Sequence, residues 1–387
     1  MSASALVIVA VGSLVAASCA LVGSFLVLRK MALLGDAISH AVLPGIVIAF
    51  LISGGRSTVS MMIGATALGV LTVFLVELSY RTRRLKEDAS IGVVFPALFA
   101  LGVLLISRYA SAVDLDLDCV LYGEIAYAPL DVLTWGDLSL GPRALWLTGF
   151  VFLLNLSLVT LFYKELKITT FDTQLAATLG FAPTLVHYLL MSLVSVTVVG
   201  SFESVGAILV VAMLVVPPSA AYLLTQRLST LLFLAVGLGV ASALFGYLLA
   251  RTLDASIAGG MAVMSGLIFL ACFCFAPRHG LLARWLRHRR LGRRLAEQLL
   301  MLHLPKAGEL GWELLDQRFR WAPGRLRAIA RRLQERGWVE PGEAGLRLTA
   351  EGVRRLEAAG QQPLRHPLGE APLGDSTAGA GPAPASP

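Results

Sequence analysis

Residues 5–28 read ALVIVAVGSLVAASCALVGSFLVL, a run without one charged side chain. A helix of this length crosses roughly 30 Å of hydrocarbon, the thickness of a bilayer core. Comparable apolar runs recur near residues 37–53, 58–78, 89–107, 144–163, 184–201, 204–225, 230–250 and 257–276. We therefore expect an all-α polytopic membrane domain over residues 1–277, with about nine transmembrane helices.

The composition of the whole chain agrees with this expectation. Hydrophobic residues make up 56% of the 387 residues, charged residues make up 15%, and the mean hydropathy is +0.75. A soluble protein contains roughly a quarter charged residues. The net charge of +7 is concentrated after residue 277, where 19 of the 32 lysines and arginines lie beside 11 of the 25 acidic residues. These values exclude one uniform soluble globule.

The basic residues between the predicted spans indicate an orientation. One set of connections carries nine of them, at positions 29, 30, 81, 83, 84, 86, 164, 167 and 227, whereas the other set carries four, at positions 56, 108, 143 and 251. Basic connections stay in the cytoplasm. We therefore expect a multi-pass protein of the inner (cytoplasmic) membrane, with its N-terminus outside and its C-terminus in the cytoplasm.

Three segments follow the last predicted span. Residues 278–292 are basic and partly amphipathic, so they are expected to be a juxtamembrane linker, either against anionic lipid or as a plain stop-transfer flank. Residues 293–358 predict a small cytoplasmic domain. Residues 359–387 are rich in proline, glycine, alanine and serine, and this composition predicts a disordered tail.

The pattern of residues 293–358 predicts a winged helix-turn-helix domain. Pro323 suits the first turn of a helix that runs to about residue 336, and residues 338–349 read as two short strands around a turn. Three apolar stripes mark the helices: Leu295, Leu299, Leu300 and Leu302; then Leu310, Leu314 and Leu315; then Leu326, Ile329, Ala330 and Leu333.

Arginines on the third helix of this domain are candidate contacts to DNA. Arg325, Arg327 and Arg331 could meet phosphates. A membrane-tethered domain meets little DNA, however, and winged helices also bind proteins. We therefore expect an interaction or regulatory role, with nucleic-acid binding as the less favoured alternative.

Asp36 and His40 lie four positions apart in the otherwise apolar sequence from Met31 to Ile46. On a helix this spacing places both side chains on one face, and at about 1.5 Å per residue from Arg29, His40 lies near the bilayer middle. Ionisable groups at that depth are costly and need a reason. A carboxylate and an imidazole suit Mn²⁺, Fe²⁺ or Zn²⁺. The alternative is a hydrogen bond between the two, or to a neighbouring serine.

Prolines interrupt two of the predicted spans. Pro44 removes the N–H group that would pair with the carbonyl of His40. Pro217 and Pro218 free two carbonyl groups in a later span, which is tolerated only beside protein or a wet cavity. These prolines are expected to be either hinges that line a path or static kinks.

The sequence around the ionisable pair resembles a known family. Gly35-Asp-Ala-Ile-Ser-His-Ala-Val-Leu-Pro-Gly45 is similar to the hallmark of the permease subunits of bacterial ABC importers for zinc, manganese and iron. Four more segments resemble that family in register: Lys86-Glu-Asp-Ala-Ser-Ile-Gly-Val-Val-Phe95, Asp116-Leu-Asp-Cys-Val-Leu-Tyr-Gly-Glu124, Phe171-Asp-Thr-Gln-Leu-Ala-Ala-Thr-Leu-Gly180 and Val205-Gly-Ala-Ile-Leu-Val-Val-Ala-Met-Leu-Val-Val-Pro217. The sequence departs from the family at Glu203 and Pro218.

The resemblance implies a transport subunit that is not itself an enzyme. Asp36 and His40 would then bind the transported divalent ion in passing, with no permanently bound cofactor. The cytoplasmic loop 164–183 would form a coupling helix, with these residues toward the ATPase: Phe171, Asp172, Ala176, Leu179 and Gly180. A plain amphipathic connector is the alternative.

The same resemblance implies three partners, namely a cytoplasmic ABC ATPase, an extracytoplasmic metal-binding protein and a second permease chain, identical or different. The chain has no GxxxxGK[ST] motif, so P-loop ATP binding must reside in another polypeptide. Asp114, Asp116 and Asp118 alternate in an expected external segment. They would attract cations or meet a binding protein, or simply form a solvated loop.

Two other functions compete with import of bare metal ions. One is a permease for a chelated metal or another small solute, which the compact Asp36/His40 pair disfavours. The other is a membrane-tethered transcription regulator, because Leu346-Arg-Leu-Thr-Ala-Glu-Gly352 resembles the wing exit of diphtheria-toxin-repressor-type metal regulators. Nine spans are far more than a tether requires. The sequence does not choose among manganese, iron and zinc.

Overall fold

The computed structural model describes residues 3–53, 58–81, 86–109, 125–135, 138–277, 280–304, 309–319, 323–342 and 345–360. The chain divides into two compact units, Met1–Arg284 and Trp285–Pro387.

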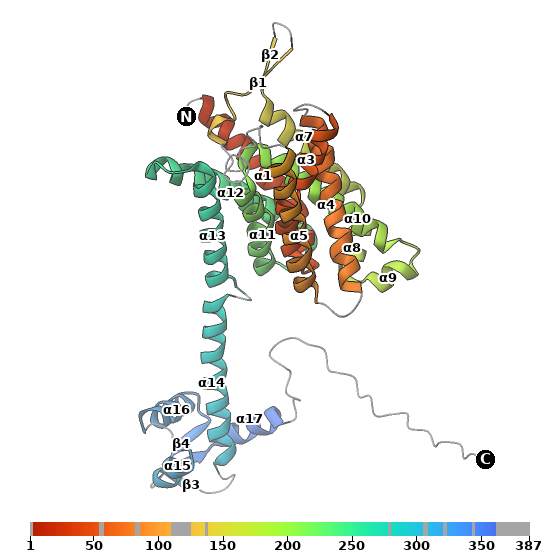
Figure 1. Cartoon of the computed structure of the whole chain (residues 1–387). Coiled ribbons are helices and arrows are strands. Elements are labelled where there is room, and N and C mark those ends of the chain that lie inside the picture. Colours follow the sequence, from red (N-terminus) through yellow and green to blue (C-terminus); the bar gives the residue numbers. More distant parts are fainter. Residues whose placement is uncertain are drawn as a thin grey trace, which may run out of the picture. The chain divides into compact units, whose positions relative to one another are not determined.

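The first unit is a bundle of long apolar helices (Figure 1). Its long helices are α1 (Ala3–Leu28), α2 (Ala32–Ala41), α3 (Leu43–Ser53), α4 (Thr58–Arg81), α5 (Glu87–Tyr109), α7 (Arg143–Leu161), α10 (Pro183–Val205), α11 (Ala207–Leu224), α12 (Leu228–Leu253) and α13 (Ile257–Phe275). Within the described residues, nine segments are long and apolar enough to cross a membrane, with α2 and α3 together forming one of them. This confirms the prediction of an all-α polytopic membrane protein.

The second span begins at Ala32, earlier than the apolar run at residue 37 indicates. Asp36 lowers the local hydropathy and hides the true start of the helix. Short elements connect the spans: η1 (Ile125–Tyr127), β1 (Val132–Trp135), β2 (Leu138–Pro142), α8 (Tyr163–Phe171) and α9 (Thr173–Thr178). The sequence did not predict the β1–β2 hairpin, which pairs antiparallel. The hairpin and the first turn of α1 lie at one end of the bundle, and α9 and the end of α13 lie at the other (Figure 1).

Small residues let the helix backbones of this bundle approach closely. Gly23 of α1 lies directly against the carbonyl oxygen of Leu214 in α11, and Gly246 of α12 lies against the backbone of Met261 in α13. Close backbone approach is the usual way in which membrane helices gain packing energy, since burial of apolar side chains offers little in lipid. The core of the first unit therefore lies around α1, whose residues from Val15 to Leu26 are all buried.

The second unit combines helices with a small sheet. The chain passes through α14 (Leu281–His303), β3 (Glu309–Gly311), α15 (Trp312–Phe319), α16 (Pro323–Glu335), β4 (Val339–Pro341), β5 (Gly345–Leu348) and α17 (Ala350–Gly360). The strands pair antiparallel in the order β3-β5-β4, with Leu310 opposite Leu346 and Glu340 opposite Arg347. The helix expected from Pro323 and the ribbon expected over residues 338–349 are both present.

The first apolar stripe of this unit was predicted wrongly. Leu300 is fully buried, but Leu295, Leu299 and Leu302 are exposed. Packing selects a neighbouring face of α14, formed by Ala296, Leu300, Met301 and Leu304. Small Ala296 and flexible Met301 suit this contact.

Two further expectations for the second unit need correction. Leu310 lies in β3 rather than on a helix, and Leu314 of the second stripe is exposed. The third stripe is buried as predicted. The α14 helix also runs without interruption through residue 292, where the sequence suggested the end of a linker. The expected tail lies almost wholly outside the described residues.

Candidate functional site

Asp36 and His40 share one face of α2, as the spacing predicts. The Nε2 atom of His40 lies 3.6 Å from Oδ1 of Asp36, and the two side chains are 32% and 48% exposed, respectively. This separation is longer than a good hydrogen bond, so the two groups converge without closing on each other. The neighbouring Ser39 donates its hydroxyl proton to the carbonyl of Gly35, within its own helix. The pair thus presents one nitrogen and one carboxylate to the surface of the bundle.

Aromatic rings from α5 flank the imidazole. The ring centroids of Phe95 and Phe99 lie 5.4 Å and 6.4 Å from that of His40, the first tilted and the second edge-on. These aromatic neighbours place apolar surface on one side of the imidazole.

The helix that carries the pair is interrupted at Val42, two residues before Pro44. The N–H groups of Gly45 and Ile46 both donate to the carbonyl of Val42, at 2.9 and 3.1 Å, and these bonds close the first turn of α3. Pro44 has no N–H to offer His40. Gly102 of α5 packs directly against the ring of Pro44, where an added Cβ would come within 2.8 Å of Cδ. The break is thus held in place by a neighbouring span.

The prolines of α11 lie close to the same helix through Leu214. Both Pro217 and Pro218 are buried, and Pro218 leaves the carbonyl of Leu214 without its helical donor. That carbonyl faces Gly23 of α1, and the side chain of Leu214 contacts Gly35, the residue before Asp36. The interrupted turn of α11 is therefore packed between α1 and α2 at Leu214, rather than lining an open space there.

A metal ion would need more than this pair to complete its coordination. Within the residues that the structure describes, no three histidine, cysteine, aspartate or glutamate side chains come together as a metal site. Ions such as Mn²⁺, Fe²⁺ and Zn²⁺ take four to six ligands, roughly. Asp36 and His40 can therefore supply part of a coordination shell, with the remainder from water, backbone oxygens or another chain.

The loop 164–183 contains a short helix, α9, at the end of the bundle away from the hairpin (Figure 1). Asp172 caps it: the N–H groups of Gln174 and Leu175 donate to its Oδ1 atom at 3.0 and 2.9 Å. Gly180 ends it with a φ of +84°, a conformation that favours glycine.

Three large apolar side chains are exposed on this loop, among exposed polar residues. Phe171, Leu175 and Leu179 are 62%, 49% and 56% exposed, and they recur every four residues. Ala176 is fully buried, so it anchors the helix instead of facing outward. Sequence reasoning missed Leu175, although its i, i+4 relation to Leu179 was the available signal. We call Phe171, Leu175 and Leu179 the apolar tip of this loop.

The hairpin end of the bundle contains an ion pair that involves Glu203. Its Oε1 atom lies 3.8 Å from Nη2 of Arg143, at the start of α7. Both side chains are partly exposed, so the pair contributes at most about 1 kcal/mol. Asp114, Asp116 and Asp118, the candidate external residues, lie outside the described residues.

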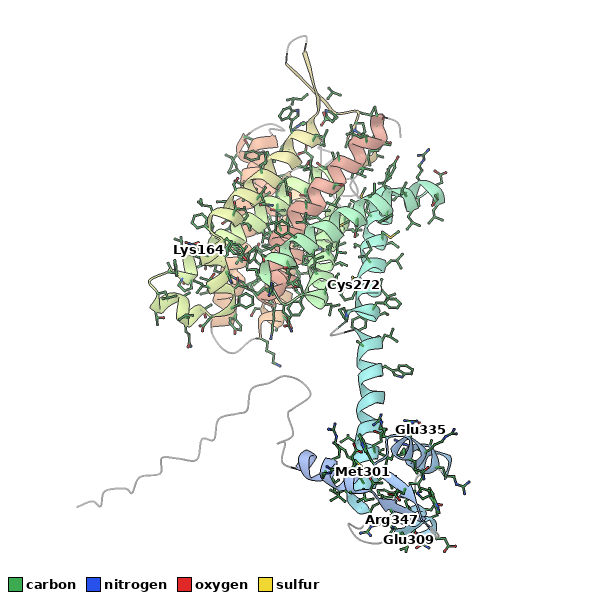
Figure 2. All side chains as sticks on the ribbon, turned by 180° about the vertical axis from the view of Figure 1, so that it is seen from behind. Lys164, Cys272, Met301, Glu309, Glu335 and Arg347 are labelled. Atoms are coloured by element: carbon green, nitrogen blue, oxygen red, sulfur yellow. The ribbon has the colours of Figure 1, made fainter. Side chains whose placement is uncertain are left out.

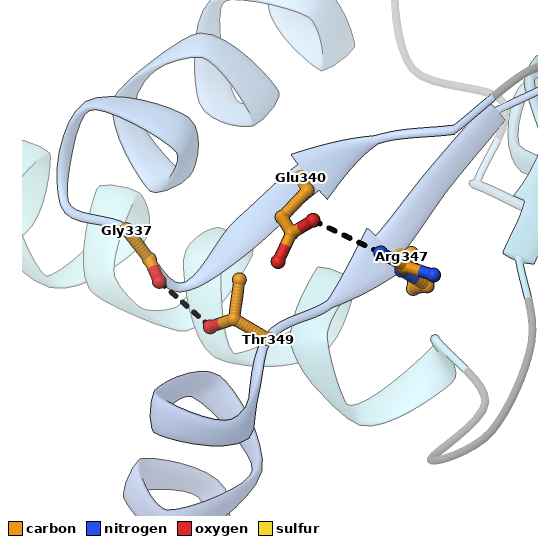
Figure 3. Close-up of polar contacts among 4 residues, drawn as sticks. All are labelled: Gly337, Glu340, Arg347 and Thr349. Carbon is orange, nitrogen blue, oxygen red and sulfur yellow. Dashed lines mark hydrogen bonds and ion pairs between the residues drawn. The ribbon is translucent and has the colours of Figure 1, made fainter.

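Acidic residues accompany the arginines of the second unit. Arg325 and Arg327 lie on the exposed side of α16, but the Nε atom of Arg331 lies 3.4 Å from Glu335. In the ribbon, Arg347 donates to Glu340 at 3.0 Å (Figure 3). Glu335 and Arg347 both lie at the surface of this unit (Figure 2). Internal pairing of this kind reduces the positive charge that a phosphate backbone would meet.

Comparison with known proteins accounts for most of the chain. Residues 3–276 match the ABC 3 transport family. The chain is 49% identical over 280 residues to the manganese transport system membrane protein MntD of Bacillus subtilis, covering 72% of this chain and 95% of that protein. It is 44% identical over 358 residues to the zinc transport system membrane protein TroD of Treponema pallidum, covering 91% and 97%.

A solved structure shares the fold. The structure of PsaBC from Streptococcus pneumoniae in complex with Fab superposes with a TM-score of 0.61 at 30% identity, covering 75% of this chain and 96% of the matched chain. The family match begins in α1 and ends just after α13, so it includes the ionisable pair, the proline turn and the α9 loop. On these grounds the chain belongs to the ABC 3 transport family.

Proposed function

We propose that this chain is the membrane permease subunit of an ATP-driven importer of divalent transition-metal ions, Mn²⁺, Fe²⁺ or Zn²⁺. The observation that carries the proposal is the Asp36/His40 pair, which converges on one face of a membrane span beside a helix break. Hard and borderline divalent ions favour this donor set. A bulky chelate would need a wide, mostly apolar pocket instead, so the proposal is import of the bare ion.

A second permease chain is expected opposite the pair. An exposed carboxylate facing lipid at mid-membrane depth costs at least about 2.5 kcal/mol, and Asp36 is half exposed in the single chain. Contact with another permease chain, or with water held between two chains, removes this cost. That partner would also supply the ligands that the described residues of one chain lack.

The apolar tip formed by Phe171, Leu175 and Leu179 is proposed to dock on a cytoplasmic ABC ATPase. A large apolar tip on a capped helix is the kind of side-chain set that fills a groove on a partner. The orientation follows from the positive-inside rule, since Lys164 and Lys167 flank this loop. The C-terminus is then cytoplasmic and the N-terminus external. The external Asp114, Asp116 and Asp118 are proposed to face a metal-binding protein that delivers the ion.

The second unit is proposed to be a winged-helix-like interaction module. The sheet order β3-β5-β4 and the helix pair α15–α16 are consistent with that fold, and the paired arginines argue against DNA. The match to TroD is longer than the first unit, whereas the match to MntD covers nearly all of that protein with 280 residues. A relative named for manganese transport is therefore about as long as the first unit alone, which favours a regulatory or docking role.

The proposal is tested by Asp36→Ala and His40→Ala in the complete transporter. Each variant should reduce the accumulation of Mn²⁺, Fe²⁺ and Zn²⁺ in cells to background at unchanged protein level, because each removes one ligand of an already partial shell. Ser39→Ala is the matched control, since its hydroxyl bonds only within α2.

Three outcomes of this experiment would contradict parts of the proposal. Normal accumulation in either alanine variant rejects the metal-binding role of the pair. Uptake of iron only when it is supplied as a siderophore complex favours the chelate permease. Loss of accumulation in Ser39→Ala to the same extent indicates general damage to α2 rather than loss of a ligand.

A further inference from the structure

Arg29 joins segments that lie far apart in the sequence. Its Nη2 atom donates to Oγ1 of Thr169 at 3.0 Å, and its Nε atom donates to Oγ1 of Thr170 at 3.3 Å. Its Nη1 atom lies 3.4 Å from Nδ1 of His187 on α10. One guanidinium group therefore contacts the last turn of α8 and the first turns of α10 from the end of α1.

The guanidinium group of Arg29 is charged and partly buried, so it needs its hydrogen bonds. The side chain is partly buried, and this burial lowers the pKa of the guanidinium group from its ordinary value. It still remains charged at neutral pH, because arginine titrates far above pH 7. A buried charge is disfavoured unless its hydrogen bonds are retained. The charge thus strongly favours the state in which α8 and α1 are joined.

The contact bridges a gap between helices. A groove of about 450 Å³ opens here, and its wall includes Arg29, Glu77, Thr173 and His187. Leu166 of α8 is buried in the same apolar core as Phe25 and Leu26 of α1, and the arginine bonds add polar contacts beside the groove. Loss of these bonds should therefore loosen the attachment of α8 to the end of α1.

On one side of Arg29 lies a rigid joint to the helix of the ionisable pair. The N–H of Lys30 bonds to Val27, and that of Met31 bonds to Leu26, closing the end of α1. Lys30 adopts a left-handed φ of 63°, a conformation that is unfavourable for a residue with a side chain. The α2 helix begins at Ala32. A shift at Arg29 is therefore passed directly to α2.

On the other side lies the proposed coupling helix. Thr169 and Thr170 precede Phe171, the last residue of α8, and Asp172 then caps α9. The two helices are separated by Asp172, whose backbone is extended, but the N–H of Asp172 bonds to the carbonyl of Ile168 in the last turn of α8 at 2.9 Å. A displacement of α9 should therefore pull on the turn that contains the two hydroxyl groups bound by Arg29.

We propose that Arg29 is a positioning residue that transmits the displacement of α9 to α2, and so links the ATPase stroke to the Asp36/His40 pair. This inference rests on the proposed function, since it takes α9 as the coupling helix and the pair as the ion site. Arg29 touches neither the ion nor the ATPase. It acts by keeping α8 and the α1–α2 joint together while α9 moves.

The test compares Arg29→Gln with Arg29→Lys in the purified transporter, assembled with its ATPase and reconstituted in vesicles. The measured quantity is the coupling ratio, the number of Mn²⁺ ions accumulated per ATP hydrolysed, beside the basal ATPase rate. In Arg29→Gln the ratio should fall by about tenfold or more, since couplings between sites are worth about 1–3 kcal/mol, while basal hydrolysis and assembly persist. Arg29→Lys, which retains the charge and a donor, should restore part of the ratio.

Arg227→Gln serves as the control, because Arg227 is another arginine at a junction before a span, but its side chain is exposed. It should keep the wild-type ratio. An unchanged ratio in Arg29→Gln would overturn the inference while the proposed function stands, provided that Asp36→Ala still abolishes uptake. Equal losses in both arginine variants, or a parallel loss of assembly and basal hydrolysis in Arg29→Gln, would also overturn it. An Asp36→Ala transporter that accumulates Mn²⁺ normally would instead reject the proposed function.

Discussion

Asp36 and His40 are the only ionisable residues between Ala32 and Ser53, where every other residue is apolar or is serine, glycine or proline. Their position on one helix face follows from periodicity alone. Their surroundings depend on residues that no local pattern predicts: Phe95 lies beside the imidazole, and Leu214 packs against Gly35. At the scale of single residues, the site is a local motif supported by remote packing.

A substitution at Gly23 would measure how much the close contact between α1 and α11 contributes to stability. A methyl group at this position would collide with the backbone carbonyl of Leu214, which cannot move aside as a flexible side chain could. We expect Gly23→Ala to lower the free energy of unfolding by about 1–3 kcal/mol, measured as thermal or denaturant unfolding of the purified protein in detergent.

Gly149→Ala in α7 is the matched control. No described atom outside its own helix surroundings lies within 4 Å of the added Cβ at that position. Its helix should be unchanged or slightly more stable, because alanine is favoured over glycine in helices by about 1 kcal/mol. Equal stability of the two variants would show that α1 and α11 separate without cost at this point.

At the scale of the element, the short helix α9 is defined by residues at its start, middle and end. Asp172 accepts hydrogen bonds from two N–H groups at its start, Gly180 adopts the positive φ at its end, and Ala176 is buried against the bundle. The exposed residues in and beside this helix include three large apolar side chains, Phe171, Leu175 and Leu179. An exposed apolar cluster of this kind marks an interaction site more often than a plain connector.

Charged substitutions in the apolar tip should separate ATP hydrolysis from transport. We expect Leu175→Glu with Leu179→Glu to release the ATPase, or to leave hydrolysis without metal accumulation, because two carboxylates cannot be buried in an apolar groove. The measurement is copurification of the ATPase together with uptake in vesicles. Leu253→Glu, exposed at the end of α12, is the control and should change neither. Intact copurification and intact coupling in the double variant would contradict the docking role of α9.

The whole molecule consists of two units with different physical characters. The first buries α1 among spans that are apolar on all sides, while the second has its own small core around Leu300, Leu315 and Leu333. Separate cores allow the units to fold independently. The longer match to TroD and the shorter match to MntD agree with a second unit that is added to a complete membrane body.

Removal of residues 285–387 is the corresponding test. We expect the truncated protein to fold and to import metal in reconstituted vesicles, with a changed response to internal metal or to a cytoplasmic partner. The isolated second unit should bind DNA weakly, with affinity that falls steeply as salt is added and with little sequence preference. Complete loss of uptake by a well-folded truncation would show that the unit is integral to transport. Tight, sequence-selective DNA binding would favour the tethered regulator.

The sequence by itself determined the membrane spans, the helical face shared by Asp36 and His40, and the helix after Pro323. Hydropathy, the 3.6-residue period and proline chemistry are local properties, so one segment contains enough information to predict each of these. The resemblance in five segments also predicted the family. The start of the second span was misplaced because Asp36 lowers the hydropathy there.

The tertiary structure alone decided which partners these local elements meet. The leucines of α14 look equivalent in sequence, yet only Leu300 of the predicted stripe is buried, because neighbouring elements pack on an adjacent face. Arg29 and Thr169 are 140 residues apart, and no period or motif connects them. Contacts at such separations depend on how whole helices pack, and packing energy is a property of pairs of surfaces. A single segment of sequence specifies only one surface of each pair.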